Sequence, residues 1–296
     1  MLRRALAFLF IIASAPAAAA QGARAQVAVL DFGGTETGLR AAERVAQVLA
    51  REGALKVAVL DRGLARAGAR GVGYSGSLNM TLAEARDLGS AVGCDFFLTG
   101  DAQTIRRSPS ERPVYFESYA SVFLVSARTG RLLLWDRPAA ERAAAAEAEA
   151  ALLSSIGPAT AARYLAAIEE AAVREERERG TAAGDEGEAV IDLSVEADGA
   201  QAPGVREPAP YRRLRPSYPE TAARAEAEAT VDASVEIDAA GRVTRVEIVR
   251  WAGFGLDDEV AATIRRMNFH PAERDGERVA VRVLLRYNFR RPPKER

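Results

Sequence analysis

The stretch Glu228–Arg250, EATVDASVEIDAAGRVTRVEIVR, decides the fold of the C-terminal part of this chain. Apolar and polar residues alternate strictly along its first half, which is the period of a strand with one buried and one solvated face. The following DAAG, Asp238–Gly241, suits a type I turn closed by a left-handed glycine, and RVTRVEIVR returns as the partner strand. The sequence therefore predicts a β-hairpin with one wet face.

The residues after this hairpin predict one helix and one further strand. Apolar residues recur at helical spacing at Leu256, Val260, Ile264 and Met267. Beyond an Asp-Gly turn, Val279–Phe289 alternates again and is the longest strand of the region. The order strand, strand, helix, strand predicts a compact antiparallel sheet with helices on one face.

Three acids and a histidine near this helix raise the question of catalysis. Asp257–Glu259 lie at the start of the predicted helix, and His270, the single histidine of the chain, lies beyond its end. An acid and a base must converge on one cleft, whereas this helix separates them by roughly 15 Å at 1.5 Å per residue. Acids at a helix N-terminus are instead stabilised by its free amides and dipole. We therefore predict no catalytic residue here.

Residues 211–291 resemble the C-terminal domain of TonB and its relatives. The landmarks that carry the resemblance are Tyr218, Pro219, Gly241, Gly255, Leu256, Asp257, Phe269, Pro271, Ala272, Gly276 and Phe289. Glu226–Glu228 stand where relatives usually carry a glycine before the strand. In that family the domain is periplasmic and non-enzymatic, and it captures a short extended peptide of an outer-membrane receptor as an added strand. The resemblance implies the same activity for this chain.

The last strand is the candidate binding edge, because it follows the hairpin and one of its edges is expected to be unpaired. Extended peptides add to such edges mainly through backbone hydrogen bonds. Arg282, Arg286 and Arg290 lie on its polar face, where we expect them to attract an acidic segment. The candidate partner-binding residues are Val279, Val281, Arg282, Val283, Leu284, Leu285, Arg286, Tyr287, Asn288 and Phe289.

Residues 26–136 have the pattern of a mixed α/β domain. Two short apolar strands, VAVLDF and KVAVLD, flank a helix, and a second helix is predicted to be capped by Thr81 with Glu84. The turn Arg128–Gly130 joins two apolar strands into a hairpin. This arrangement is similar to the periplasmic α/β domain shared by the N-terminal region of TolB, FlgO and CsgG. That resemblance implies a role in assembly at the outer membrane.

The two predicted domains are joined by a helical segment and a linker. Residues 137–179 are rich in alanine and charged residues and predict helices, with a break at Gly157–Pro158. Residues 180–210 have the composition of a linker, although VIDLSVEA within them suits one strand. The whole chain is therefore predicted to be α+β, with the mixed α/β domain first and the small antiparallel sheet last.

Composition and motifs argue against an enzyme. Lys and Arg number 40 against 41 acids, which indicates no nucleic-acid partner. One cysteine and one histidine rule out a cysteine-rich or multi-histidine metal site. LDFGGTETG, Leu30–Gly38, looks like the phosphate loop of sugar kinases and actin-type ATPases, so an ATP-binding enzyme is an alternative. That fold needs a second domain and a second acidic motif, so we predict no catalytic residue, cofactor or metal.

The N-terminus predicts the location. MLRR, the apolar run ALAFLFIIASA and the Ala-x-Ala sites before Gln21 and Gln26 are typical of a secretory signal peptide, residues 1–25. We therefore expect a periplasmic TonB-family protein of the Gram-negative cell envelope, linked to TonB-dependent transmembrane transport. Its expected partner is an outer-membrane receptor or other envelope protein, or a second copy of the chain. The alternative is a retained inner-membrane anchor, which would make the chain an energy transducer acting with an inner-membrane motor complex.

Overall fold

The computed structural model describes residues 24–109, 113–181, 190–194 and 204–291. Residues 1–23, which make up most of the predicted signal peptide, lie outside these ranges.

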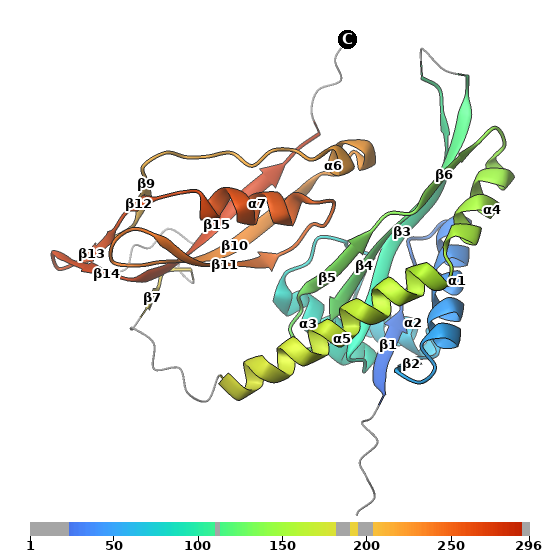
Figure 1. Ribbon diagram of the computed structural model, residues 1–296, viewed down its shortest axis with the longest axis horizontal. Helices are drawn as coiled ribbons and strands as arrows, with labels where there is room; N and C mark the ends of the chain where they lie inside the picture. The colour runs from blue at the N-terminus through green and yellow to red at the C-terminus, as the bar shows by residue number, and fades with distance from the viewer. Residues whose placement is uncertain (1–23, 110–112, 182–189, 195–203, 292–296) are drawn as a thin grey trace, which may run out of the picture.

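A mixed sheet forms the centre of the N-terminal domain (Figure 1). Its described strands are β1 (Ala25–Val29), β2 (Val57–Val59), β3 (Phe96–Arg107), β4 (Tyr115–Ser126), β5 (Leu132–Asp136) and β6 (Ala139–Arg142). They follow the order β2-β1-β3-β4-β5, with β6 pairing to β4. The pairs of β1 with β2 and β3 are parallel, and the pairs made by β4 are antiparallel. The sheet is therefore parallel at one side and a meander at the other.

Helices cover both faces of this sheet. One face packs on α1 (Glu36–Glu52), α4 (Ala145–Ser155) and α5 (Pro158–Thr181), and the other on α2 (Arg62–Gly71) and α3 (Leu82–Val92). Consecutive strand residues point to opposite faces, so Val27 and Val29 join the first core while Ala28 and Leu30 join the second. Burial on both sides explains why these strands are apolar throughout.

Local sequence signals in this domain are borne out in part. Thr81 accepts a hydrogen bond from the Glu84 amide at 3.1 Å, and the Glu84 carboxylate accepts from the Thr81 amide at 2.7 Å, which is the predicted capping box. The break between α4 and α5 falls at Gly157. The expected helical segment 137–179, however, begins with β6, a strand that pairs with β4 despite its alanine-rich sequence.

The C-terminal domain is a second sheet with helices on one face, as predicted. Its strands are β10 (Ala229–Ile237), β11 (Val243–Arg250), β15 (Val281–Phe289) and the short β7 (Ile191–Asp192), in the order β11-β10-β15-β7. The helices are α6 (Glu220–Ala225) and α7 (Leu256–Arg265). The predicted apolar face of β10 is buried against α7, in the core that contains Val231, Ala233, Val235, Ile237, Leu256, Val260 and Ile264.

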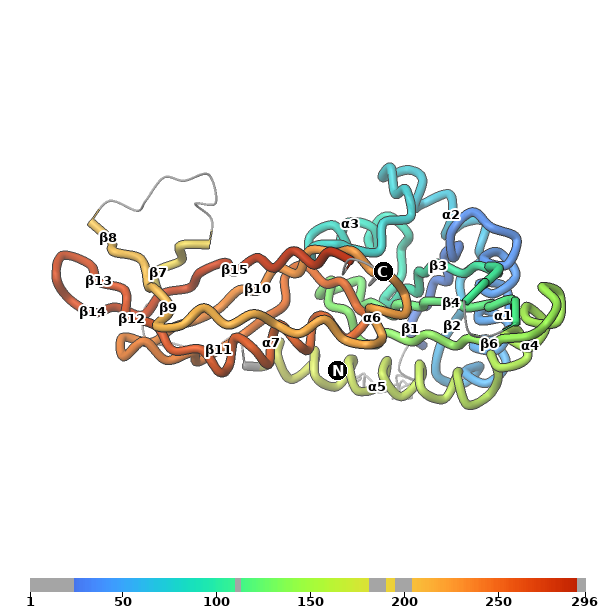
Figure 2. Tube along the Cα trace, turned by 90° about the horizontal axis from the view of Figure 1, so that it is seen from above, coloured from blue at the N-terminus to red at the C-terminus, as the bar shows by residue number. Residues whose placement is uncertain are grey.

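Short strands at the far end of this domain include part of the expected linker. They are β8 (Val205–Arg206), β9 (Ala209–Pro210), β12 (Phe269–His270), β13 (Ala272–Arg274) and β14 (Glu277–Val279). β8 pairs with β13, β9 pairs with β12, and β7 pairs with β15. The expected linker, residues 180–210, therefore contributes three short strands to the C-terminal domain. Figure 2 shows the two domains end to end along the long axis of the molecule.

Candidate partner-binding edge and the domain interface

The predicted binding strand, β15, has one fully paired edge and one largely open edge. Its inner edge pairs with β10 from Val281 opposite Ile237 to Phe289 opposite Ala229. Its outer edge accepts hydrogen bonds only near its start, where the amides of Ile191 and Leu193 donate to the carbonyls of Ala280 and Arg282 at 3.0 and 2.8 Å. Beyond Arg282, no residue in the described part of the chain makes a backbone hydrogen bond to this edge.

The free backbone groups of this edge can be assigned to particular residues. Backbone groups alternate in direction along a strand that pairs regularly, and the pairing with β10 has no register shift. Because the carbonyls of Ala280 and Arg282 face β7, the amides and carbonyls of Leu284, Arg286 and Asn288 face the same open side. These three residues form the open row of β15.

The other candidate residues lie in the core face or elsewhere. Val281 is fully buried, and the core also contacts partly buried residues of the same face: Val283, Leu285, Tyr287 and Phe289. The Tyr287 hydroxyl donates to the sulfur of Met267 at 3.8 Å, and burial raises the pKa of Tyr287. Val279 lies in β14, opposite Ala272 and outside β15. The candidate residues of β15 thus form two groups: residues whose backbone groups face the open edge, and residues whose side chains pack against the core.

The arginines of the polar face already have acidic partners. Arg286 donates two hydrogen bonds to the buried carboxylate of Asp232, at 2.7 and 3.0 Å. Arg282 donates to Glu236 at 2.8 Å and to Asp192 of β7 at 3.2 Å. The bond to Glu236 raises the pKa of Arg282. Both arginines were expected to be available to an acidic segment, but the cross-strand acids of β10 occupy them first.

A second feature, which the sequence did not indicate, is the interface between the two domains. The loop Trp251–Gly255, between β11 and α7, inserts its two rings into the second core of the N-terminal domain. Trp251 is 1% exposed, stacks on Phe123 with ring centroids 5.8 Å apart, and donates its indole N–H to the Gly130 carbonyl at 3.0 Å. Phe254 contacts Phe123 edge-on at 5.6 Å. The loop thus completes the cover over one face of the N-terminal sheet.

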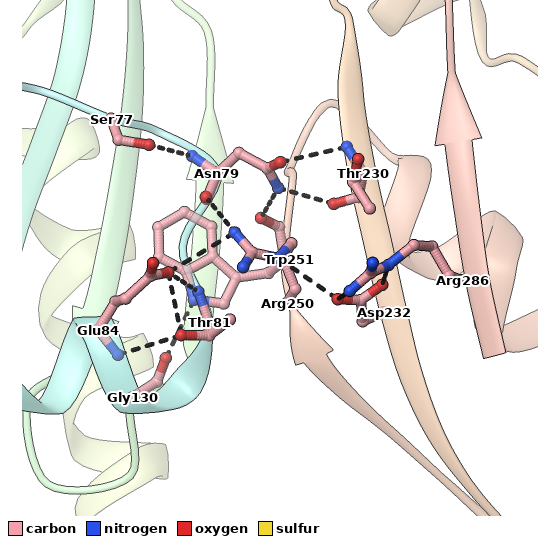
Figure 3. Close-up of polar contacts among 10 residues, drawn as sticks. All are labelled: Ser77, Asn79, Thr81, Glu84, Gly130, Thr230, Asp232, Arg250, Trp251 and Arg286. Atoms are coloured by element: carbon pink, nitrogen blue, oxygen red, sulfur yellow. Dashed lines mark hydrogen bonds and ion pairs between the residues drawn. The ribbon is translucent and has the colours of Figure 1, made fainter. Parts of the chain in front are cut away.

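Polar contacts around Asn79 fix the same interface (Figure 3). The Asn79 side-chain N–H₂ donates to the carbonyls of Thr230 and Trp251, each at 2.7 Å, and its oxygen accepts from the Thr230 amide at 3.1 Å. The Trp251 amide donates to the Met80 carbonyl at 3.1 Å. Arg250 also donates to the Asn79 carbonyl at 3.1 Å. A side-chain amide with every polar group bonded specifies one arrangement of the two domains.

The backbone of the inserted loop has an unusual conformation. Gly253, Phe254 and Gly255 all have positive φ, at 72°, 56° and 78°. A Cβ atom at Gly253 would lie 2.4 Å from the ring of Phe123, so the loop needs glycine there for space as well as for conformation. Asp257 accepts from the amides of Ala252 and Gly253, each at 2.8 Å, and burial raises its pKa to about 6. The acid at the start of α7 therefore holds the preceding loop.

The remaining residues singled out in the sequence have structural contacts. His270 lies in β12 against the ring of Tyr211, with centroids 4.0 Å apart. Asp31 of the DFGGT stretch forms ion pairs with Arg62 at 2.6 Å and Arg66 at 2.8 Å. Thr35 of the same stretch caps α1. Within the described ranges, no group of three or more acidic, histidine or cysteine side chains is arranged to hold a metal ion.

The C-terminal domain is thus an α+β domain in which, among the described residues, the outer edge of β15 is unpaired beyond Arg282. Residues 215–290 match the family described as Gram-negative bacterial TonB protein C-terminal, which confirms the resemblance of this part of the chain. That family belongs to the cell envelope and consists of protein-interaction domains rather than enzymes. No helix among the described residues has the length and apolar character that a membrane crossing requires.

Comparison with solved structures gives several partial likenesses, and no curated protein matches the chain. The solution NMR structure of the Pseudomonas aeruginosa TonB CTD is 20% identical, with 36% of this chain and 95% of that chain covered and a TM-score of 0.26. Lipoprotein GNA1162 of Neisseria meningitidis is 12% identical, with 45% and 94% covered and a TM-score of 0.30. The PelC dodecamer of Paraburkholderia phytofirmans is 12% identical, with 45% and 86% covered and a TM-score of 0.26.

Proposed function

We propose that this chain is a periplasmic TonB-family protein that binds envelope partners by adding an extended segment of the partner to β15, in connection with TonB-dependent transport. The observation that carries the proposal is the open row of Leu284, Arg286 and Asn288, next to a strand face that is already supported by the core. Unpaired amides and carbonyls in such a row bind an added strand, and neighbouring side chains select it. We expect the partner to be an outer-membrane receptor with an extended N-terminal segment.

The N-terminal domain has the role of a docking platform in this proposal. Its resemblance to the TolB, FlgO and CsgG domain suggests assembly at the outer membrane. The bonds of Asn79 and the burial of Trp251 support a fixed presentation of the C-terminal sheet. The platform therefore orients the open edge of β15 relative to whatever the N-terminal domain binds.

Release into the periplasm requires removal of the predicted signal peptide, and the fold favours one of the two cleavage sites. Cleavage after Ala25 would remove the first residue of β1, which pairs with Val57, and the Arg24 side chain that donates to the Ala54 carbonyl at 2.9 Å. Cleavage after Ala20 would leave both contacts intact. We therefore expect the mature chain to begin at Gln21, and intact-mass measurement of the envelope protein checks this.

The proposal is tested by substituting Leu284 in the full chain. Leu284→Pro deletes an amide of the open row, whereas Leu284→Ala keeps that amide and is the matched control. Because the Leu284 amide faces away from β10, neither change removes a bond between β15 and β10. Titration with peptides copied from receptor N-terminal segments should show about tenfold weaker binding by Leu284→Pro, which corresponds to one hydrogen bond.

The control and the contrary result are both measurable. Leu284→Ala should bind within about twofold of the unmodified chain, and circular dichroism should show that both variants keep their sheets. Equal affinity of Leu284→Pro and Leu284→Ala, or peptide-induced amide shifts confined to α7, would mean that partners bind elsewhere on the domain.

A further inference from the structure

The outer edge of β15 already holds one added strand, which comes from the chain itself. β7 lies parallel to β15, with Ile191 opposite Val281 and Asp192 opposite Arg282. It is held by the amides of Ile191 and Leu193, which donate to the carbonyls of Ala280 and Arg282. We call the described segment Val190–Ser194 the linker strand.

The side chains of the linker strand show what chemistry this edge accepts. Ile191 and Leu193 pack at the border of the C-terminal core. Asp192, between them, accepts a hydrogen bond from Arg282 at 3.2 Å. The order apolar, acidic, apolar thus matches an apolar border and an arginine that binds Glu236 of β10 through one guanidinium nitrogen and Asp192 through another.

The hold of the linker strand on the edge is small. Its described contacts with β15 are the backbone hydrogen bonds of one short parallel pairing and one ion pair, whose partners Arg282 and Asp192 are 37% and 38% exposed. Such an exposed ion pair contributes little, and a net hydrogen bond also contributes only modestly. Attachment to the same chain compensates, because a segment of the same chain binds intramolecularly and so acts at a high effective concentration. The linker strand can therefore hold the edge and still be displaced by a segment with more contacts.

We propose that the linker strand is a built-in competitor for the β15 edge, and that partners displace it with a parallel segment that carries an acidic residue between two apolar ones. The inference rests on the proposed function and extends it by naming the partner chemistry and the regulation. A partner segment that starts beside Val281 can continue along Leu284, Arg286 and Asn288, where the linker strand makes no backbone bond. Those added bonds favour the exchange.

The test uses the full chain and a peptide that copies Glu188–Ala197, EAVIDLSVEA. The double variant Ile191→Pro/Leu193→Pro removes both amide donors of the linker strand, and Ile191→Ala/Leu193→Ala keeps them. We expect the proline variant to bind the peptide at least tenfold more tightly than the unmodified chain, because its edge is free. The alanine variant should fall between the two. A peptide with lysine in place of the aspartate should bind the proline variant about fivefold more weakly, because it loses an exposed ion pair with Arg282.

The outcomes separate this inference from the proposed function. If receptor peptides bind the unmodified chain and the proline variant equally well, the linker strand does not compete for the edge, and the proposal of strand addition is unaffected. A second outcome is that the copied peptide binds the proline variant with amide shifts at Leu284 and Arg286 while receptor peptides bind neither protein. That result supports competition by the linker strand and contradicts the proposed class of partner. If no peptide binds a proline variant that circular dichroism shows to be folded, both are wrong.

Discussion

Gly253 lies against the ring of Phe123, which belongs to a core of the N-terminal domain. A Cβ atom there would lie 2.4 Å from that ring. Its φ is positive, in the loop from which Trp251 and Phe254 enter the same core. A residue with a Cβ would meet both a steric and a conformational obstacle here. Docking of the two domains therefore depends on a glycine that lies far from the open row of β15.

We predict that Gly253→Ala lowers the free energy of unfolding by about 3 kcal/mol, the combined effect of a left-handed alanine and overpacking. Gly276→Ala is the matched control, because Gly276 has a φ of 88° but open space around its Cβ position. We expect the control to lose about 1 kcal/mol. Urea unfolding of both variants measures the difference, and equal losses would show that Phe123 yields to the added methyl group.

Asp257 makes the stability of the loop depend on pH. Its pKa is raised by burial from an ordinary value of 3.8 to about 6, so the folded chain binds this proton more tightly than the unfolded chain does. The stabilisation is complete below the unfolded pKa and is lost as the pH rises through 6. We expect the free energy of unfolding relative to Asp257→Asn to fall by about 2 kcal/mol between about pH 4.5 and pH 7.5.

Denaturant unfolding of both proteins at several pH values measures this difference. Asparagine does not titrate, so any pH dependence that the two proteins share comes from other groups and cancels. A difference that stays constant, or that grows with pH, contradicts a raised pKa at Asp257.

The sequence predicts the role of a residue whose contacts lie within a few positions of it, but not the role of a residue whose partner is far away in the sequence. The capping box of Thr81 and Glu84 spans three residues, and its pattern predicts it. Trp251 bonds to Gly130, 121 residues away, and no pattern near Trp251 indicates that contact. Within Glu226–Glu228, the departure from the glycine expected before the strand, Glu226 has a φ of 50° at the end of α6, a conformation that favours glycine.

At the scale of elements, strand periodicity predicted which faces of β10 and β15 are buried, because alternation depends only on the strand itself. The prediction of element type failed where tertiary pairing determines the element. Ala139–Arg142 forms β6 and not a helix, because it pairs with the edge of β4. The sequence around β7 suits a strand but does not indicate which strand it pairs with. Its place beside β15 depends on a pairing between residues 90 positions apart, Asp192 and Arg282, and local patterns do not carry such information.

Helix α5 is held to the sheet by a buried acid near its C-terminal end, Glu175. The Glu175 carboxylate is 7% exposed and accepts hydrogen bonds from Ser126 at 2.6 Å, Arg128 at 2.8 Å and Thr129 at 3.2 Å. These bonds connect α5 to the turn between β4 and β5. The helix is therefore held to the sheet at its charged end as well as along its apolar face.

We predict that Glu175→Ala lowers the free energy of unfolding by about 2 kcal/mol, because it leaves three donors without their acceptor. Glu176→Ala changes a neighbouring acid that is 70% exposed, and it should stay within about 0.5 kcal/mol of the unmodified chain. Thermal unfolding of the two variants checks the prediction. Similar losses in both would mean that general helix charge, and not the turn contact, is responsible.

At the scale of the whole molecule, the two domains have separate cores but share one boundary. The sheet domain has its own core around α7, which is why residues 205–296 are expected to fold alone. Trp251 and Phe254, however, belong to a core of the N-terminal domain. Separation of the domains would therefore expose two aromatic rings and leave the Asn79 amide to water.

The only two tryptophans of the chain, Trp135 and Trp251, both lie at this boundary, so fluorescence reports on it. We expect residues 205–296 alone to emit at longer wavelength than the full chain and to be quenched by acrylamide. Addition of residues 24–181 carrying Trp135→Phe, so that Trp251 is the emitting ring, should shift the emission back and protect the ring. Equal emission of the isolated domain and the full chain would mean that Trp251 is not buried by docking.

The central claim is that partners add a strand to the outer edge of β15. Amide hydrogen exchange of the full chain, resolved by residue and measured with and without a receptor peptide, tests it most directly. The account predicts that the peptide slows exchange at Leu284, Arg286 and Asn288. Exchange at Val283, Leu285 and Tyr287, whose amides already face β10, should stay slow throughout. Peptide binding that leaves the first three amides unprotected would contradict strand addition at this edge.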